Sequence, residues 1–213
     1  MTLEYPSTPK AWKGYVGDVT TILFVRHGET DWNREGRFQG SQDIPLNEEG
    51  RAQARRLAQA WDWGGEVLLS SPLSRARETA EILATSLGLS LLPPDPRLSE
   101  RHYGEGEGLT LVERNQRFPD GRVPRVESPE SIRQRAREFL ELVTRDHPGH
   151  RVVAVSHGGF INVALSLVSE GELGTGRTFL GNASVSTIVL SAGGWSVASV
   201  GQTVEVAPLG LKE

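Results

Sequence analysis

The chain contains no cysteine, which excludes disulfides, thiolate nucleophiles and cysteine-ligated metals and is compatible with a cytoplasmic protein. It also lacks long hydrophobic runs. No stretch approaches the roughly 18 apolar residues that cross a membrane. The first 18 residues contain no continuous apolar segment of the kind found in secretory signals. We therefore expect a cytoplasmic protein with no membrane partner.

Lysine is nearly absent, since it occurs only as Lys10, Lys13 and Lys212, so arginine supplies almost all of the positive charge. The planar guanidinium fork suits phosphate and carboxylate ligands, although a genomic base bias explains the same composition equally well. The net charge of −4 argues against a general nucleic-acid binder. At 213 residues the chain fits one domain of ordinary size. We assign 1–19 to an N-terminal extension and 20–213 to that domain.

Strand and helix patterns alternate along the chain. Strands are expected at 21–25, 66–69, 152–155, 184–190, 195–200 and 203–206. Helices are expected after Asn47, after Ser71 with Pro72 as its first residue, after Ser128 and from about Phe160. The segment 104–127 has no clean period and is interpreted as a loop or lid. This order predicts an α/β fold, a three-layer α/β/α sandwich with a mostly parallel central sheet.

Two His-Gly turns close two of the expected parallel strands. Arg26-His27-Gly28 follows the first strand, and Ser156-His157-Gly158-Gly159 follows the strand at 152–155. Ligand sites of open α/β sheets lie at the carboxyl ends of the strands. We therefore expect His27 and His157 to face one crevice, although a core histidine beside a solvent-facing arginine would explain the Arg26-His27-Gly28 turn alone.

Arginines follow a third strand on the same edge of the sheet. Arg75 lies in the first turn of the helix expected after Ser71, and a helix N-terminus favours anions. Arg75 and Arg77 cannot share one helix face, so at most one of them points into the crevice. Helical geometry alone does not choose between them.

Two other motifs resemble ligand-binding sites, but their sequence context argues against binding. The segment 171–178 imitates a phosphate-binding P-loop, but it follows a helical stretch and has arginine in place of the lysine. His147 and His150 flank a Pro-Gly turn with no third ligand close in sequence, which favours an exposed turn over a metal site. We expect no metal and no cofactor.

Six motifs in order resemble the histidine phosphatase superfamily, the phosphoglycerate mutase-like family, from Thr20 onward. They are Arg26-His27-Gly28-Glu29-Thr30 with Asn33, Phe38-Gln39-Gly40, Pro45-Leu46, Ser71-Pro72-Leu73-Ser74-Arg75-Ala76, Leu98-Ser99-Glu100-Arg101-His102-Tyr103-Gly104, and Ser156-His157-Gly158. Each motif is weak or moderate by itself, but their shared order makes the resemblance specific.

The resemblance implies that His27 is the nucleophile that becomes phosphohistidine and that Glu100 donates a proton to the leaving group. It implies a phosphate pocket of Arg26, Arg75 and His157, with a hydrogen bond from Asn33, and so selects Arg75 over Arg77. The further substrate contacts that it implies are Gln39, Gly40, Arg101, His102, Tyr103, Gly158 and Gly159. The chemistry is plausible without a metal, because two guanidiniums and an imidazolium can neutralise a transferring phosphoryl group.

The reaction can be hydrolysis or transfer. A short segment between Glu100 and Ser128, together with Glu29-Thr30 and Gln39-Gly40, resembles the phosphatase branch, so we predict a phosphomonoester hydrolase acting on a small phosphorylated metabolite. The stretch Arg101-His102-Tyr103-Gly104 instead has the form found in cofactor-dependent phosphoglycerate mutases. Four arginines of the lid fit a second phosphate or carboxylate, or are solvated surface charge: Arg114, Arg117, Arg122 and Arg125. The third possible function is non-catalytic binding of phosphorylated ligands. The protein could also form a homodimer.

Overall fold

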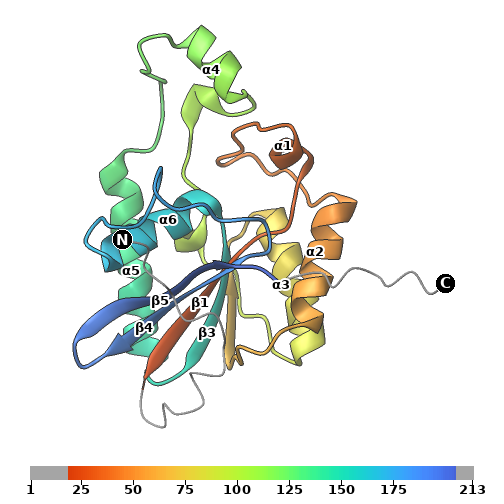
Figure 1. The fold of residues 1–213 in the computed structure, drawn as a ribbon, viewed down its shortest axis with the longest axis vertical. Helices are drawn as coiled ribbons and strands as arrows, with labels where there is room; N and C mark the ends of the chain where they lie inside the picture. The colour runs from red at the N-terminus through yellow and green to blue at the C-terminus, as the bar shows by residue number, and fades with distance from the viewer. Residues whose placement is uncertain (1–18, 205–213) are drawn as a thin grey trace, which may run out of the picture.

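A computed structural model describes residues 19–204, which form a five-stranded sheet between two layers of helices (Figure 1). Most of the N-terminal extension and residues 205–213 lie outside the described residues. The strands are β1 (Thr20–Arg26), β2 (Val67–Ser70), β3 (Arg151–Ser156), β4 (Val185–Ser191) and β5 (Gly194–Gln202). The helices are α1 (Asp31–Arg34), α2 (Glu48–Gln59), α3 (Ser74–Leu87), α4 (Leu111–Arg117), α5 (Pro129–Asp146) and α6 (Gly158–Val168).

The sheet has the order β2-β3-β1-β4-β5. β1 and β2 both pair with β3 in parallel, whereas β4 runs antiparallel to β1 and to β5. Only β4 therefore runs against the common direction among the described strands. The predicted three-layer α/β fold with a mostly parallel sheet is confirmed, with an antiparallel edge that the sequence pattern did not separate.

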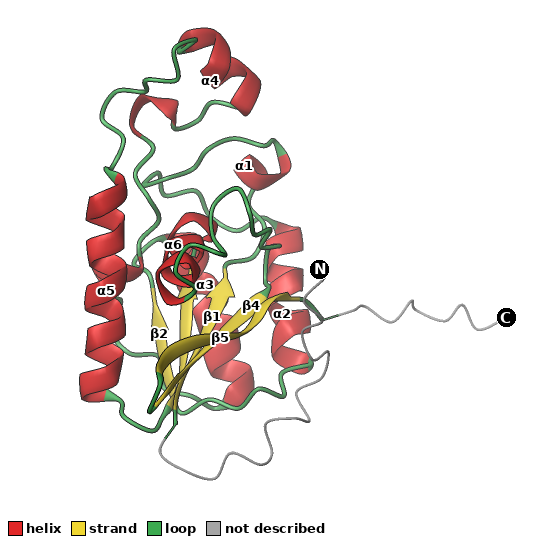
Figure 2. Ribbon diagram, turned by 60° about the vertical axis from the view of Figure 1, so that its left-hand side comes forward, coloured by secondary structure: helices red, strands yellow, loops and turns green. Residues whose placement is uncertain are grey.

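Alternating side chains of β1 divide the core into two layers. Ile22 and Phe24 pack with α5 and α6, whereas Leu23 and Val25 pack with α2 and α3 on the other face. A strand that is apolar at successive positions is expected where helices cover both faces of a sheet. The two helical layers stand on opposite sides of the sheet in Figure 2.

Capping residues explain why two helices begin where the sequence predicts. The Asn47 side chain accepts the Gly50 N–H at 2.8 Å at the start of α2, and Ser128 accepts the Ser131 N–H at 3.1 Å at the start of α5. These bonds satisfy N–H groups that have no partner inside the helix. Among the described helices none is long and apolar enough to span a bilayer.

Three expectations were wrong or incomplete. The third helix begins at Ser74 with Leu73 as its N-cap, not at Ser71, because the Ser71 hydroxyl bonds His157 instead. The segment 104–127 contains α4, whose cap Thr110 accepts the Glu113 N–H, and α4 stands beyond the strand ends in Figure 2. The strand expected at 203–206 is not formed at 203–204, and 205–206 lie outside the described residues.

Candidate active site

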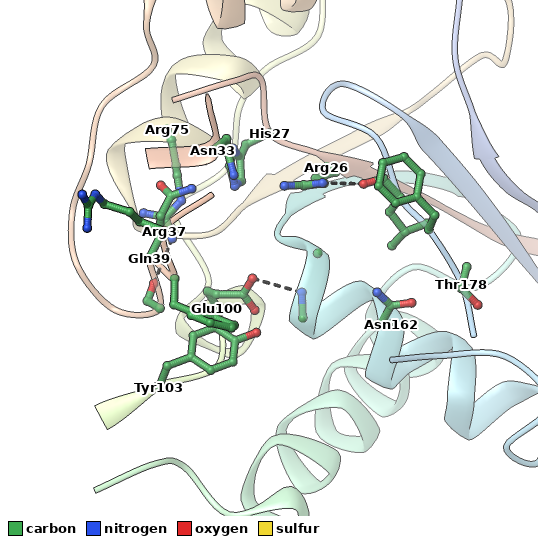
Figure 3. Close-up of a pocket in the computed structure, with 16 residues that line it drawn as sticks. Arg26, His27, Asn33, Arg37, Gln39, Arg75, Glu100, Tyr103, Asn162 and Thr178 are labelled. Atoms are coloured by element: carbon green, nitrogen blue, oxygen red, sulfur yellow. Dashed lines mark hydrogen bonds between the residues drawn. The ribbon is translucent and has the colours of Figure 1, made fainter. Parts of the chain in front are cut away.

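A cavity of about 260 Å³ opens at the carboxyl ends of β1 and β3, where the two His-Gly turns meet (Figure 3). It is lined by Arg26, His27, Asn33, Arg37, Phe38, Gln39, Gly40, Arg75, Glu100, Tyr103, Gly158, Gly159, Asn162, Thr178, Phe179 and Leu180. Segments far apart in the sequence thus converge on one polar hollow.

His27 follows the last residue of β1 and continues the sheet by donating its backbone N–H to the Ser156 carbonyl at 3.0 Å. Its ring is buried, and Nδ1 lies 2.6 Å from the carbonyl oxygen of Gly28. Because a carbonyl only accepts, Nδ1 carries the proton and Nε2 keeps its lone pair. Gly28 must be glycine here, since a Cβ would lie 2.3 Å from the backbone oxygen of Gly50.

His157 lies beside His27, as the two turns predict, with the ring centroids 5.1 Å apart. Its Nε2 is 2.8 Å from the Ser71 hydroxyl, and its buried Nδ1 has no partner among the described residues. Burial first, and then the positive charge of Arg75, hold the pKa of both imidazoles well below 6.5. A lowered pKa favours a neutral imidazole at His157 over the imidazolium expected from the sequence.

Two buried guanidinium groups supply the positive charge. Arg26 donates to the Leu180 carbonyl, and Arg75, which is fully buried, donates to the carbonyls of Gly40 at 2.9 Å and Gln42 at 2.7 Å. Burial lowers the pKa of Arg75 to about 10, which still leaves it charged at neutral pH. Arg77 instead pairs with Glu81 at 3.0 Å, so the structure chooses between the two arginines of α3.

Unpartnered polar atoms concentrate around this cavity. Buried polar groups in proteins nearly always have a hydrogen-bond partner, so exceptions call for an explanation. Within residues 19–204, Nε of Arg26, Nε of Arg75 and Nδ1 of His157 are buried with none. They are the three groups that the sequence assigns to phosphate binding. The arrangement suits a ligand that brings several acceptor oxygens at once.

Glu100 lies at the N-terminus of α6, where its carboxylate accepts the N–H groups of Gly159 at 3.0 Å and Phe160 at 3.1 Å. It also accepts its neighbour Arg101 N–H at 2.8 Å. A Cβ on Gly159 would lie 2.4 Å from Glu100 Oε1, so glycine is required for this approach. Figure 3 shows the carboxylate across the cavity from the histidine.

Asn33, Gln39 and Gly40 complete the wall opposite α6. The Asn33 Oδ1 accepts from Thr30 N–H at 3.2 Å and from Asn182 Nδ2 at 3.2 Å, which fixes the side-chain amide toward the cavity. Gln39 is buried, and its Oε1 has no partner among the described residues. Gly40 has a φ of 55°, a conformation that favours glycine.

Only some of the remaining predicted substrate contacts line the cavity. Tyr103, Gly158 and Gly159 line the cavity, whereas Arg101 lines a neighbouring one. The structure does not bring His102 to either hollow. Its half-exposed ring instead accepts the Gly104 N–H at 2.9 Å.

Sequence reasoning missed several lining residues. Asn162 lies one helical turn beyond Gly158 and Gly159, so its spacing on α6 offered a usable signal. Arg37 and Phe179 offered no such signal in the sequence. Arg37 also pairs with Glu35 and Glu113, and Phe179 is 88% exposed on a loop. Among the described residues no cluster of three or more His, Cys, Asp or Glu side chains is placed to hold a metal ion.

Comparisons with known proteins agree with this geometry. The family model described as histidine phosphatase superfamily (branch 1) matches residues 22–203. The "uncharacterized phosphatase PhoE" of Bacillus subtilis is 38% identical over 180 residues, which cover 84% of this chain and 93% of that protein. The "probable phosphoglycerate mutase GpmB" of Cronobacter sakazakii is 35% identical over 213 residues, covering 90% and 97%.

A solved structure shares the fold as well. The structure titled Bacillus stearothermophilus YhfR has a TM-score of 0.79 and 32% identity, and the match covers 87% of this chain and 98% of that one. The family match spans nearly all of the described residues and includes both His-Gly turns, Arg75 and Glu100. The chain belongs to the histidine phosphatase superfamily, branch 1.

Proposed function

We propose that the protein is a metal-independent phosphomonoester hydrolase that acts on a small phosphorylated metabolite through a phosphohistidine at His27. One observation carries the proposal. The buried nitrogens Arg26 Nε, Arg75 Nε and His157 Nδ1 belong to the side chains whose charge or ring lies next to His27, and they have no partner among the described residues, which suits a phosphoryl group with several acceptor oxygens.

In the first step the lone pair on His27 Nε2 attacks phosphorus in line with the leaving oxygen. The N–P bond forms as the P–O bond to the leaving group breaks. The leaving alkoxide takes a proton from Glu100, which has to be protonated for this step. The bond from Nδ1 to the Gly28 carbonyl keeps the attacking nitrogen unprotonated and stabilises the positive charge that develops on the ring.

The fixed donors stabilise the charge that builds up on the equatorial oxygens of the phosphoryl group. Arg26 and Arg75 act as buried cations, which cost no reorganisation at the moment of transfer. His157 acts as a neutral donor: when the Ser71 hydroxyl donates to its Nε2, the proton resides on Nδ1. The Ser71 hydroxyl can donate to His157 while its oxygen accepts the Leu73 N–H, because a hydroxyl is both donor and acceptor.

In the second step a water molecule attacks the phosphohistidine. Glu100, now a carboxylate, takes the proton from this water, the P–N bond breaks and inorganic phosphate leaves. The N–H groups of Gly159 and Phe160 hold the carboxylate in place as an acceptor. The cycle returns His27 and Glu100 to their starting protonation states.

A phosphoglycerate mutase is the second candidate, supported by the relative named as such and by Tyr103 and Arg101 near the cavity. The lid favours hydrolysis, because Arg117 and Arg125 are both paired with Glu105, which reduces the charge open to a second phosphoryl group. A cytoplasmic location and a homodimer stay predictions from the sequence.

The test compares wild type, His27→Ala and the matched control His150→Ala, an exposed histidine on a turn. Each protein is incubated with p-nitrophenyl phosphate, and separately with 3-phosphoglycerate plus 2,3-bisphosphoglycerate. We expect release of phosphate by wild type and His150→Ala, and its loss in His27→Ala. Isomerisation of phosphoglycerate without release of phosphate would establish the mutase. If neither reaction occurs and no phosphoprotein forms, the protein is a binder.

A further inference from the structure

Six of the nine described arginines without a carboxylate partner line three neighbouring cavities. Most arginines of the chain form ion pairs, and within residues 19–204 the exceptions are Arg26, Arg55, Arg75, Arg101, Arg114, Arg122, Arg133, Arg151 and Arg177. Arg26 and Arg75 belong to the phosphoryl cavity. Arg101, Arg114, Arg133 and Arg177 line two further cavities beside it.

The three cavities are neighbours that share lining residues. An intermediate hollow of about 220 Å³ shares Phe38, Tyr103 and Gly159 with the phosphoryl cavity. It shares a different set of lining residues, Arg101, Val163 and Thr175, with an outer cavity of about 340 Å³. The outer cavity lies between α5, α6 and the loop that follows α6. Its volume is that of a small-molecule site, so the whole path exceeds the needs of a phosphoryl group.

Arginines line both of the further cavities. The intermediate hollow is lined by Arg101 and Arg114 beside the apolar Phe38 and Val126, and the outer cavity is lined by Arg101 and by the exposed Arg133 and Arg177. Neither hollow is lined by an Asp or Glu among the described residues. Like charges that converge without a counterion repel one another, so an anionic ligand there is electrostatically favoured.

Asn162 joins the two ends of this path. It lines both the phosphoryl cavity and the outer cavity, and its buried Oδ1 has no partner among the described residues. A hydroxyl or amino group on a ligand that spans the two cavities would satisfy this oxygen. In Figure 3 the Asn162 side chain lies on the far side of the cavity from Arg75.

We propose that the outer cavity is a second anion site, built by Arg133 on α5 and Arg177 on the loop after α6. The preferred substrate is a phosphomonoester that carries a second anionic group, a carboxylate or a phosphate, at the end distant from the transferred phosphoryl. This proposal rests on the proposed function for the identity of the transferred group. The second anion is bound but is not transferred.

The test measures kcat/KM for two pairs of substrates. 3-Phosphoglycerate and glycerol 3-phosphate differ in a carboxylate, and fructose 1,6-bisphosphate and fructose 6-phosphate differ in a distal phosphate. In the double variant Arg133→Gln/Arg177→Gln, we expect the preference for the substrate with the second anionic group to fall about tenfold in one pair, mainly through a higher KM. This tenfold fall corresponds to about 1.4 kcal/mol. The pair that responds identifies the anion.

Arg55→Gln is the matched control, because Arg55 is exposed on α2, has no ion pair among the described residues and lies outside the three cavities. It should leave the preference within about twofold of wild type. Three results would overturn the proposal. They are an equal fall in kcat/KM for both members of each pair, an unchanged preference in the double variant, and the same loss of preference in Arg55→Gln.

Failure of the proposed function has a different signature. Absence of hydrolysis with every substrate would contradict the hydrolase, and the second anion site is then judged by calorimetry. In a His27→Ala background, which prevents turnover, the member of one pair that carries the second anionic group should bind about tenfold more tightly than the member that lacks it. The Arg133→Gln/Arg177→Gln substitutions should abolish that difference. Equal binding of both members would overturn the second site alone.

Discussion

His27 and His157 place two buried imidazoles next to the buried guanidinium group of Arg75. Burial disfavours their protonated forms, and the neighbouring Arg75 adds repulsion, so the pKa of each ring lies well below 6.5. At neutral pH the proposed nucleophile, His27, is therefore expected in its neutral form. A typical exposed histidine would lose part of that population below pH 7.

This state can be measured with ¹⁵N-labelled imidazoles. We predict that His27 is neutral at pH 6 and carries its proton on Nδ1, as the 2.6 Å contact with the Gly28 carbonyl requires. His150, exposed on a turn, provides an internal reference in the same spectrum. A His27 resonance that titrates with its midpoint at pH 6.5 or above would contradict this account of the site.

Ser71 orients His157, and a substitution tests this positioning role. Ser71→Ala leaves Nε2 of His157 without a partner and frees its tautomer, so we expect kcat to fall about tenfold. The matched control is Ser70→Ala, because the Ser70 hydroxyl is also buried but has no partner among the described residues. Equal kcat values in the two variants, with similar unfolding temperatures, would rule out a positioning role.

Single residues were predictable where chemistry restricts the choice. Motif order predicts that the two histidines, Arg75 and Glu100 share one site, and the structure brings His27, Arg75 and Glu100 to one cavity with His157 beside His27. Ser71 was misassigned as a helix cap because Ser-Pro is a common helix start. Its true partner is 86 positions away, which no local pattern reveals.

At the level of elements, the first turn of α6 holds Glu100, the proposed proton donor. Its N–H groups bind the Glu100 carboxylate, and the positive end of the helix favours a negative group there. This geometry needs the chain to approach closely, which explains a glycine at position 159.

Substitution of this glycine is the corresponding prediction. In Gly159→Ala the new Cβ would lie 2.4 Å from Glu100 Oε1, so the carboxylate has to move, and we expect kcat to fall about 10²-fold. Gly158→Ala is the closest control, because its Cβ makes only ordinary contacts, the nearest at 3.5 Å with Arg26. Equal losses in the two variants would show that a general effect on the helix, not displacement of Glu100, is responsible.

Elements differed in how well they could be predicted. α2 and α5 combine a side-chain cap with a regular apolar face, so both were found. α4 has seven residues and none of them buried, so it leaves no hydrophobic period. The direction of β4 was also hidden, because a buried strand has the same apolar pattern in parallel and antiparallel pairing.

Across the whole molecule, a buried carboxylate connects the separate segments of the site. Glu107 accepts the N–H groups of Ser41 and Tyr103, both at 2.9 Å, and the Gln42 side chain at 3.0 Å. Although burial raises its pKa, these hydrogen bonds lower it to a net value below the ordinary one. Glu107 thereby connects the loop 40–42, whose carbonyl groups bind Arg75, to the segment that follows Glu100.

The buried histidines also set the acid stability of the whole protein. Their folded pKa values lie below the unfolded value of 6.5, so their contribution is complete above pH 6.5 and is lost as the pH falls toward the folded values. Between about pH 6.5 and 5, above the range of ordinary carboxylates, the free energy of unfolding should fall by about 1 kcal/mol per pH unit for each histidine.

Denaturant unfolding at several pH values measures this dependence. His27→Ala removes one of the two groups, so its slope over the same pH range should be about half that of wild type. His150→Ala, which changes an exposed side chain, should keep the wild-type slope. A wild-type stability that does not change between pH 6.5 and 5 would contradict neutral burial of the pair.

The most direct test of the central claim is to trap the covalent intermediate. Wild-type protein is mixed with a phosphomonoester labelled in its phosphoryl group, quenched with alkali within milliseconds, digested and sequenced by mass spectrometry. The mechanism predicts an acid-labile, alkali-stable phosphoryl group on the peptide that contains His27, absent from His27→Ala. Turnover of the same substrate with the label on another residue, or with no labelled protein at any quench time, would contradict it.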